Sequence, residues 1–234
     1  MTAPATPSSR PGAPAPLLRS RAPVALVGAG PVAPEALADC LARAPVAAAA
    51  DGGAAALLAA GRVPDVVIGD LDSLLARDRA RLPPERVHRV AEQDTTDFEK
   101  CLLRIDAPLV LATGFLGGRA DHALAALSAL ARGVGPRCVL LSASDAVCHL
   151  PARLALDLAP GARVSLFPMA PVTGASEGLR WPIAGIPFAP AGRVGTSNEA
   201  LGGSARLSMD APGMLLVVPR AALDALLAGL AAAA

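Results

Sequence analysis

The sequence predicts an α/β domain built on a parallel sheet, followed by a smaller all-β sandwich domain. In the first part, short apolar runs alternate with segments of helical spacing, which is typical of a parallel sheet covered by helices. Beyond about Leu150, short apolar segments are separated by clusters of Gly, Pro and Ser, which favours β-structure. The expected organisation is a disordered tail over residues 1–21, an α/β domain over 22–150 and a β-sandwich with a C-terminal helix over 151–234.

The individual elements follow from the spacing of the apolar residues. In the first part we expect strands over residues 24–27, 46–50, 66–68, 109–112 and 138–142. The helices expected between them cover residues 34–43, 54–60 and 122–132, and a further helix begins near Asp97. In the second part, strands are expected over residues 163–167, 205–209 and 215–218, and a helix over 221–234.

The composition is that of a globular protein. At 234 residues and 53% hydrophobic content, the chain can bury a full core. The net charge of +1 and the aromatic content of 2% give no reason to expect a nucleic-acid partner or a base-stacking surface. No uninterrupted apolar stretch approaches the roughly 20 residues of a membrane span. We therefore expect a cytoplasmic protein that binds neither nucleic acid nor membrane.

The cysteines and the first residues are not expected to carry chemistry. The four cysteines show no Cys-x-x-Cys spacing, and Cys101 and Cys148 are expected to be small buried residues. The first stretch is rich in Pro, Ala and Ser and lacks the apolar core of a signal peptide, which predicts a disordered tail.

Two pairs of aspartates are the main candidates for a functional site. Asp70 and Asp72 follow a predicted strand in Gly-Asp-Leu-Asp-Ser, and Asp94 and Asp97 flank a predicted helix N-terminus in Gln-Asp-Thr-Thr-Asp-Phe. Thr96 and Glu99 match the capping-box pattern at this helix start. Mg²⁺ prefers oxygen ligands, and helix N-termini favour phosphate oxygens. Aspartate is also common in turns and helix caps, but two such pairs together favour Mg²⁺-dependent phosphoryl chemistry.

A competing pattern lies farther upstream. Residues 28–33, Gly-Ala-Gly-Pro-Val-Ala, follow a predicted strand, and Asp51 ends the next strand, as in a dinucleotide-binding fingerprint. This pattern makes an NAD-linked oxidoreductase the alternative. However, Pro31 and Pro34 disturb the loop where a helix should meet the pyrophosphate, and the fingerprint leaves the later aspartates unexplained. The chain has no Walker sequence of a P-loop kinase.

Five motifs, in order, resemble the thiamine pyrophosphokinase family. The resemblance extends over about residues 24–218. The motifs are Asp-Gly-Gly (51–53), Gly-Asp-Leu-Asp-Ser (69–73), Gln-Asp-Thr-Thr-Asp-Phe-Glu-Lys (93–100), Gly-Gly-Arg-Ala-Asp-His (117–122) and Thr-Ser-Asn (196–198).

The resemblance implies an α/β nucleotide-binding domain followed by a β-sandwich, assembled as a homodimer with its sites at the interface. The implied reaction transfers the diphosphoryl group of ATP to the hydroxyethyl oxygen of thiamine, giving thiamine diphosphate and AMP, with Mg²⁺ as cofactor. A non-catalytic module that binds thiamine or a nucleotide remains a further alternative, although the aspartates that such a module would lack are present.

The resemblance also assigns roles to residues. Asp70, Asp72 and Asp97 are the expected Mg²⁺ ligands, and Asp94 completes the catalytic carboxylates. The residues expected to bind nucleotide and phosphate are Asp51, Gly52, Gly53, Lys100, Gly117, Gly118, Arg119, Asp121 and His122. Trp181, Ser197 and Asn198 are expected to bind thiamine.

Some of these assignments compete with simpler ones. Lys100 would by default be a solvated surface cation, His122 a residue that caps or packs at a helix start, and Trp181 a core residue. Two positions depart from the family pattern, because Ala55 and Ala126 stand where an asparagine is common. Each loses an amide that could hydrogen-bond nucleotide or backbone.

Overall fold

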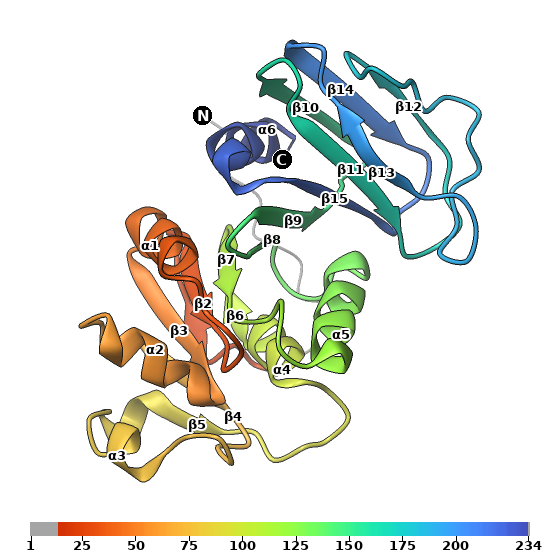
Figure 1. Ribbon diagram of the computed structural model, residues 1–234. Coiled ribbons are helices and arrows are strands. Elements are labelled where there is room, and N and C mark those ends of the chain that lie inside the picture. Colours follow the sequence, from red (N-terminus) through yellow and green to blue (C-terminus); the bar gives the residue numbers. More distant parts are fainter. Residues whose placement is uncertain (1–13, 234) are drawn as a thin grey trace, which may run out of the picture.

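The structure is a computed structural model, and it describes residues 14–233. The described residues form a mixed α/β fold with three sheets (Figure 1), which confirms the expected fold class at that level. The largest sheet has ten strands in the order β13-β11-β15-β9-β8-β7-β2-β3-β4-β5.

The N-terminal part of this sheet is parallel. Neighbouring strands from β8 to β5 all pair in parallel, and the order of the strands reverses between β7 and β2. Ligands of such sheets bind beyond the carboxyl ends of the strands at this reversal point. The strands are β2 (Val24–Val27), β3 (Val46–Ala50), β4 (Val66–Gly69), β5 (Val87–Arg89), β7 (Val110–Thr113) and β8 (Cys138–Leu141).

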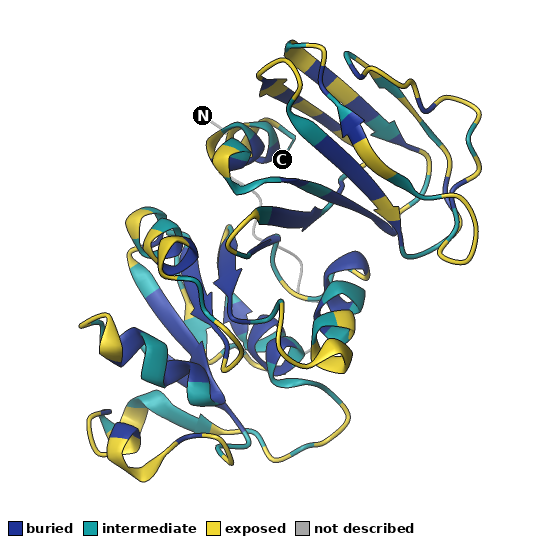
Figure 2. Ribbon diagram, in the orientation of Figure 1, coloured by how far each residue is buried: buried dark blue, intermediate teal, exposed yellow. Residues whose placement is uncertain are grey.

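Helices cover both faces of the parallel strands, because successive residues of each strand point to opposite faces. On β2, Val27 packs with Leu37 and Leu57, whereas Leu26 packs with Phe98 and Leu130 on the other face. One face is covered by α1 (Pro34–Arg43) and α2 (Ala54–Ala59), with α3 (Ala76–Arg79) beyond them, and the other by α4 (Asp97–Arg104) and α5 (Ala120–Ala131). Figure 2 shows the strands between these layers as buried.

The ten-stranded sheet continues past residue 150 without a break. Strand β9 (Asp145–His149) pairs antiparallel with β8 and with β15, so the second part of the chain extends the same sheet. A three-stranded sheet, β10-β14-β12, packs against it through buried leucines such as Leu156, Leu166, Leu207 and Leu216. The elements are β10 (Arg153–Leu158), β11 (Arg163–Pro168), β12 (Gly174–Glu177), β13 (Gly195–Glu199), β14 (Gly203–Met209), β15 (Met214–Pro219) and α6 (Leu223–Ala232).

The predicted N-terminal tail is wrong in its extent. Strand β1 (Leu18–Arg19) pairs in parallel with β6 (Ile105–Asp106), and the backbone N–H groups of Leu17 and Ser20 donate to carbonyls of Arg104 and Asp106. These bonds, together with the packing of Leu18 on the core, hold a segment whose composition predicted disorder. Residues 1–13 lie outside the described part of the chain.

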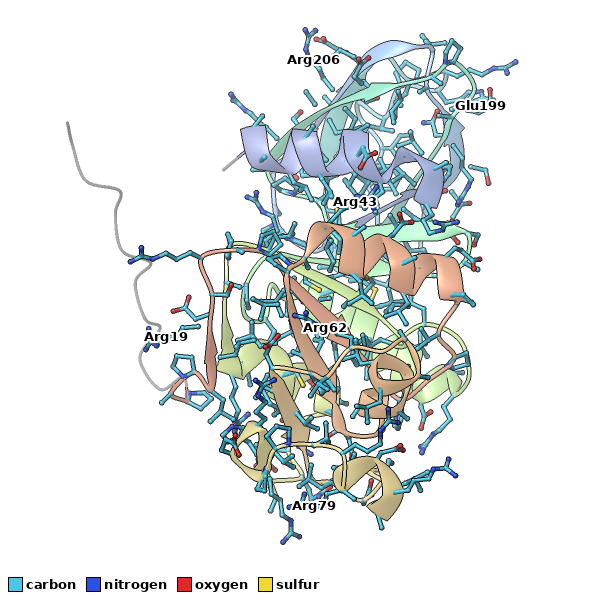
Figure 3. The ribbon with its side chains drawn as sticks, turned by 90° about the vertical axis from the view of Figure 1, so that its left-hand side faces the viewer. Arg19, Arg43, Arg62, Arg79, Glu199 and Arg206 are labelled. Carbon is cyan, nitrogen blue, oxygen red and sulfur yellow. The ribbon has the colours of Figure 1, made fainter. Side chains whose placement is uncertain are left out.

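A network of ion pairs ties α1 to the C-terminal elements. Asp39 accepts hydrogen bonds from Arg43, at 2.7 Å, and from Arg220 in the short helix η3 (Arg220–Ala222). Arg43 also donates to Asp224 of α6 at 2.9 Å, and Figure 3 shows Arg43 between the two helices. Burial alone would raise the pKa of Asp39, but the hydrogen bonds from Arg220 and Arg43 and their charges together lower it.

The cysteines are free and buried, as predicted for Cys101 and Cys148. Burial raises the pKa of the Cys148 thiol to about 12, so it stays protonated and inert. Among the described helices, none is both long and apolar enough to cross a membrane.

Candidate active site

A cavity of about 400 Å³ lies where the strand order reverses. Gly30, after β2, and Gly114, after β7, contribute backbone to its wall. A Cβ on Gly30 would lie 2.7 Å from the carbonyl oxygen of Gly114, so only glycine allows the two loops to approach this closely. The cavity therefore occupies the position where a ligand of a parallel α/β sheet is expected.

Three carboxylates converge beside this cavity. Asp51 follows β3, Asp70 follows β4, and Asp97 is the first residue of α4 and lines the cavity itself. One oxygen from each lies within 4.8 Å of the others. At such distances and an effective dielectric constant of ~20, two carboxylates repel each other by roughly 3 kcal/mol. An arrangement of this kind is suited to a cation, which would offset the repulsion.

Asp51 is the most constrained member of the cluster. It is 1% exposed and has a positive φ of 47°, and its Oδ2 accepts a hydrogen bond from the backbone N–H of Ser73 at 3.2 Å. Its Oδ1 is buried and has no hydrogen-bond partner among the described residues. Burial, followed by the charges of Asp97 and Asp72, raises the pKa of Asp51 to about 6. Since buried polar atoms are rarely left without a partner, this oxygen indicates a missing ligand, and a hard cation fits it.

Gly69 explains how Asp51 and Asp70 come so close. A Cβ on Gly69 would lie only 2.8 Å from the Cβ of Asp51. Any side chain at the end of β4 would therefore displace Asp51 from the cluster.

Asp72 and Asp94 lie at the edge of this group. Asp72 is exposed, its Oδ1 accepts a hydrogen bond from the Ser73 hydroxyl at 2.9 Å, and its backbone N–H donates to Asp70 at 3.3 Å. Asp94 is also exposed, and its backbone N–H donates to Glu92 at 2.9 Å. The carboxylates of Asp51, Asp70 and Asp97 thus come together, and the charge of Asp72 acts on Asp51 from the edge of the cluster.

Lys100 is not the solvated cation that its position in a helix suggested. Its side chain is 3% exposed, and its Nζ lies 3.2 Å from Asp97 Oδ1 and 3.7 Å from Asp70 Oδ2. The default assignment was wrong because Lys100 lies one helical turn after Asp97, on the helix face that packs toward β4. Burial alone would lower the pKa of Lys100, but the hydrogen bond with Asp97 and the charges of Asp97 and Asp70 raise it.

The loop that carries Asp94 is organised by Glu92, which sequence reasoning missed. The Glu92 carboxylate accepts hydrogen bonds from the backbone N–H groups of Asp94 and Thr95 and from the Thr95 hydroxyl. The Thr95 hydroxyl, as the largest cause, lowers the pKa of Glu92. The predicted capping box is confirmed, because Thr96 and Glu99 make both of its hydrogen bonds at the start of α4. The signal for Glu92 was its position two and three residues before Asp94 and Thr95, where a side chain can accept hydrogen bonds from nearby backbone N–H groups.

The glycine-rich loop before α5 forms another part of the cavity wall. Gly117 and Gly118 have φ values of 85° and 70°, which glycine adopts without strain, and both line the cavity with Arg119 and His122. Arg119 donates to Asp121 at 2.6 Å, and this hydrogen bond, as the largest cause, lowers the pKa of Asp121 to about 2. The His122 side chain is exposed at the cavity and does not pack in the core.

Two aromatic rings close one side of the cavity. The ring centroids of Phe98 and Phe115 lie 4.6 Å apart. The sequence drew no attention to Phe115, because a single phenylalanine after a strand is most simply a core residue. Gly52 and Gly53 form the short turn η1 (Asp51–Gly53), in which a Cβ on Gly53 would meet the Val27 carbonyl oxygen at 2.0 Å.

The residues expected to bind thiamine gather at a second cavity, of about 320 Å³, in the second part of the chain. Trp181 is 51% exposed, which excludes the core assignment, and the Arg180 guanidinium lies 5.0 Å from the centroid of its ring. Ser197 and Asn198 of β13 line the same cavity. In the described part of the chain, the two cavities have no lining residue in common.

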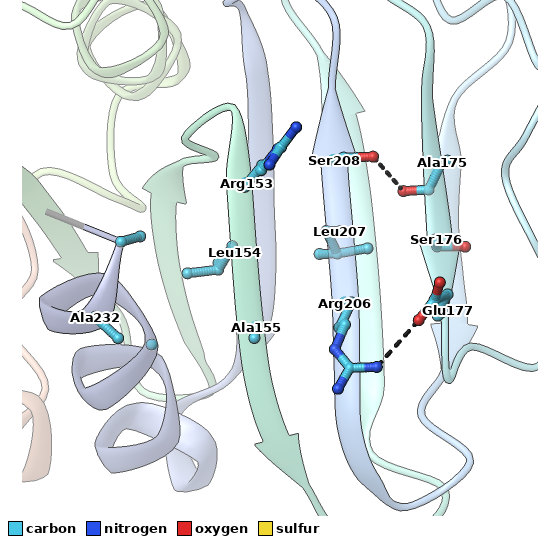
Figure 4. A pocket seen from close by; sticks show the side chains of 12 residues that line it. Arg153, Leu154, Ala155, Ala175, Ser176, Glu177, Arg206, Leu207, Ser208 and Ala232 are labelled. Carbon is cyan, nitrogen blue, oxygen red and sulfur yellow. Dashed lines mark hydrogen bonds and ion pairs between the residues drawn. The ribbon is translucent and has the colours of Figure 1, made fainter.

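A larger groove, of about 510 Å³, lies over the outer face of the three-stranded sheet (Figure 4). Most of its lining side chains are small, and its one lining carboxylate among the described residues, Glu177, is paired with Arg206 at 3.1 Å. The predicted site residues do not line this groove.

The part of the chain that carries the acidic site is similar to known proteins. Residues 37–140 match the family model described as thiamin pyrophosphokinase, catalytic domain. A rice protein, thiamine pyrophosphokinase 1, is 30% identical over 166 residues, which cover 63% of each chain. A Bacillus subtilis thiamine pyrophosphokinase is 36% identical over 91 residues, 36% of this chain and 42% of its own length. The chain is thus similar to thiamine pyrophosphokinases, and the match to the family model covers less than half of it.

Solved structures of thiamine pyrophosphokinases share the fold. The Candida albicans enzyme superposes with a TM-score of 0.73 at 15% identity, and the match covers 91% of this chain and 94% of that enzyme. The Geobacillus thermodenitrificans protein gives a TM-score of 0.68 at 24% identity, and the match covers 84% of this chain and 96% of that protein. These structural likenesses show a common fold only. The chain spans just under two thirds of the length of the rice protein.

The match to the thiamine pyrophosphokinase model contains every residue of the acidic cluster, Lys100 and the glycine-rich loop, whereas Trp181 and Asn198 lie beyond it. It does not favour the NAD-linked alternative. The two departures from the family pattern fall inside the match, where Ala126 is buried in the core and Ala55 is half-buried in α2.

Proposed function

We propose that this protein transfers the diphosphoryl group of ATP to the hydroxyethyl oxygen of thiamine, giving thiamine diphosphate and AMP. The observation that carries the proposal is the cluster of Asp51, Asp70 and Asp97, with its unpaired buried oxygen, beside a cavity lined by Arg119 and four glycines. Similarity to thiamine pyrophosphokinases supports the choice of thiamine as acceptor.

The residues of the cluster fit Mg²⁺. All three residues offer carboxylate oxygens. The Oδ1 of Asp51 has no hydrogen-bond donor among the described residues, and a cation would interact with it instead. We assign Asp51, Asp70 and Asp97 as ligands, and Asp72 and Asp94 as acceptors for the water molecules that Mg²⁺ retains. When bound, Mg²⁺ neutralises charge on the phosphates and helps to orient them for in-line attack.

The first cavity is assigned to ATP. Gly117 and Gly118 let the backbone approach a phosphate, and the Arg119 guanidinium and the N-terminus of α5 favour its charge. Phe98 and Phe115 offer an apolar wall to the base. Gly52, Gly53, Asp121 and His122 complete the nucleotide site. We thus assign binding of ATP and Mg²⁺ to residues 22–150 as the α/β domain.

The second cavity is assigned to thiamine, within residues 151–234 as the β-sandwich domain. An exposed indole face suits a flat, cationic ligand, and Ser197 and Asn198 supply polar groups beside it. Because the two cavities share no described lining residue, we further propose that a cytoplasmic homodimer brings the ATP site of one chain to the thiamine site of its partner.

The test is AMP release from ATP by purified protein, with and without thiamine and Mg²⁺. The proposal predicts AMP release that requires both. AMP release that ignores thiamine, or none from folded protein, would contradict it.

A further inference from the structure

Lys100 is unusual in the composition of this chain. Of the 21 lysine and arginine residues, it is the only lysine. Its side chain is also the one basic group that contacts the acidic cluster in the described part of the structure. A chain that otherwise uses arginine for every cation has a lysine at this position.

The position of Lys100 is that of a cation between two of the carboxylates. Its Nζ lies 3.2 Å from Asp97 and 3.7 Å from Asp70, and its side chain is 3% exposed. Glu92 is a third carboxylate that acts on its charge. Since the ammonium group is buried, solvent screens these interactions little. Lys100 therefore holds together carboxylates that belong to different elements, the end of β4 and the start of α4.

The ammonium group of Lys100 reduces the net negative charge of the cluster. The carboxylates of Asp51, Asp70 and Asp97, when ionised, carry three negative charges, and the ammonium group of Lys100 leaves two. Asp72 and Glu92, which act on Asp51 and Lys100 from outside this cluster, are not included in the count. One divalent cation neutralises the remainder. Without the ammonium group, a single divalent cation would leave a negative charge in a largely buried site.

We propose that Lys100 is a positioning residue that stands in for one cation of the cluster, so that the site is assembled before metal arrives and accepts a single divalent ion. This inference rests on the proposed function, because it takes the three aspartates as metal ligands. From the sequence, Lys100 was expected to contact phosphate. Because its ammonium group already faces Asp70 and Asp97, we assign it the positioning role instead.

The choice of lysine follows from size. An ammonium group is a compact point charge, whereas guanidinium is a wide planar fork that would extend into the space between the carboxylates. Lys100→Met should thus free a cation position, and Lys100→Arg should obstruct the one that remains.

The experiment measures Mn²⁺ binding to full-length, nucleotide-free protein by electron paramagnetic resonance, together with the melting temperature in EDTA and in Mn²⁺. The wild type should bind one Mn²⁺ per chain and Lys100→Met two, and Lys100→Arg should bind at least tenfold more weakly than the wild type. Lys100→Met should also melt lower in EDTA and gain more from Mn²⁺. Arg132→Met is the matched control. Arg132 pairs with Glu99 of α4, the helix that carries Lys100, but it does not contact the acidic cluster.

Equal stoichiometry and equal stabilisation in the wild type and Lys100→Met would overturn this inference and leave the metal site intact. No Mn²⁺ bound by the wild type would overturn the metal site as well. Should Lys100→Met not fold, the wild type decides, because two ions per chain would contradict the stand-in role and one would support it.

Discussion

The side chain of Asn198 holds both backbone polar groups of Trp181. Its Oδ1 accepts a hydrogen bond from the Trp181 N–H at 3.2 Å, and its Nδ2 donates to the Trp181 carbonyl at 2.7 Å. Asn198 is 6% exposed while Trp181 is 51% exposed, so a buried amide fixes the backbone beneath an exposed indole. In the proposed enzyme, Asn198 would contribute to thiamine binding by holding the Trp181 indole in position at the second cavity.

Thiamine should quench the fluorescence of Trp181, the sole tryptophan. The expected cause is contact between the aminopyrimidine or thiazolium ring and the indole at the second cavity. Asn198→Ala leaves both Trp181 backbone groups unpaired, so it should weaken the thiamine affinity by about tenfold, equivalent to ~1.4 kcal/mol. A fluorescence titration measures both effects.

The control is Arg206→Ala, which breaks the surface ion pair with Glu177. Both residues lie in the three-stranded sheet, away from β13, so this variant should leave the titration unchanged. Thiamine binding that is evident by calorimetry but leaves the Trp181 spectrum unaltered would place the vitamin elsewhere.

Truncation should distinguish the strand β1 from the residues before it. A chain that starts at Arg21 loses β1, its hydrogen bonds to Arg104 and Asp106 and the packing of Leu18, whereas a chain that starts at Pro14 keeps them. We expect the shorter chain to be less stable than the longer one by roughly 2 kcal/mol. Denaturant unfolding of the two chains measures the difference, and equal midpoints would show that β1 adds no stability.

Asp39 should make stability sensitive to acid. Because its pKa is lowered in the folded state, its contribution is present above the unfolded pKa of about 4 and is lost as the pH falls through the folded value. Asp39→Asn should therefore cost roughly 1 kcal/mol at pH 7, and the difference from the wild type should shrink below about pH 4. Thermal melts across this range test the sign. A difference that grows as the pH falls would contradict the assignment to the ion pairs with Arg43 and Arg220.

Much of the fold was predictable where local pattern decides it. The apolar runs at residues 24–27 and 46–50 are β2 and β3, and the helix predicted over 34–43 is α1 with the same bounds. The capping box of Thr96 and Glu99 is confirmed as well. In these segments, the residues that set the local structure are adjacent in the sequence.

The rest depends on contacts between distant segments. The pairing of β1 with β6 joins residues about 87 positions apart, and composition alone gave no sign of it. The continuity of the large sheet through β9 likewise depends on pairing with β15, near the end of the chain. The two aspartate motifs marked the site, but that Asp51 joins Asp70 and Asp97, and that Lys100 is buried between two of them, follows from the packing of β3, β4 and α4.

The cluster should be essential for turnover but not for folding. Asp97→Asn removes a charge that the proposed Mg²⁺ site requires, and we expect kcat/KM to fall on the order of 10³-fold. Asp72→Asn should also lose turnover, and a near-normal rate would remove Asp72 from the site. Asp106→Asn, which affects only a surface pair with Arg19, is the control and should retain full activity. Steady-state rates at several Mg²⁺ concentrations, with melting temperatures, separate a catalytic from a folding defect.

Phosphorus NMR of a reaction mixture that contains ATP, thiamine, Mg²⁺ and the wild-type protein tests the central claim most directly, with Asp97→Asn run in parallel. We expect AMP and thiamine diphosphate in equal amounts from the wild type, and no detectable amount of either over the same time from a folded Asp97→Asn protein. ADP with thiamine monophosphate, or orthophosphate without a thiamine product, would contradict diphosphoryl transfer. Product formed equally by Asp97→Asn would contradict the assignment of the acidic cluster as its catalytic centre.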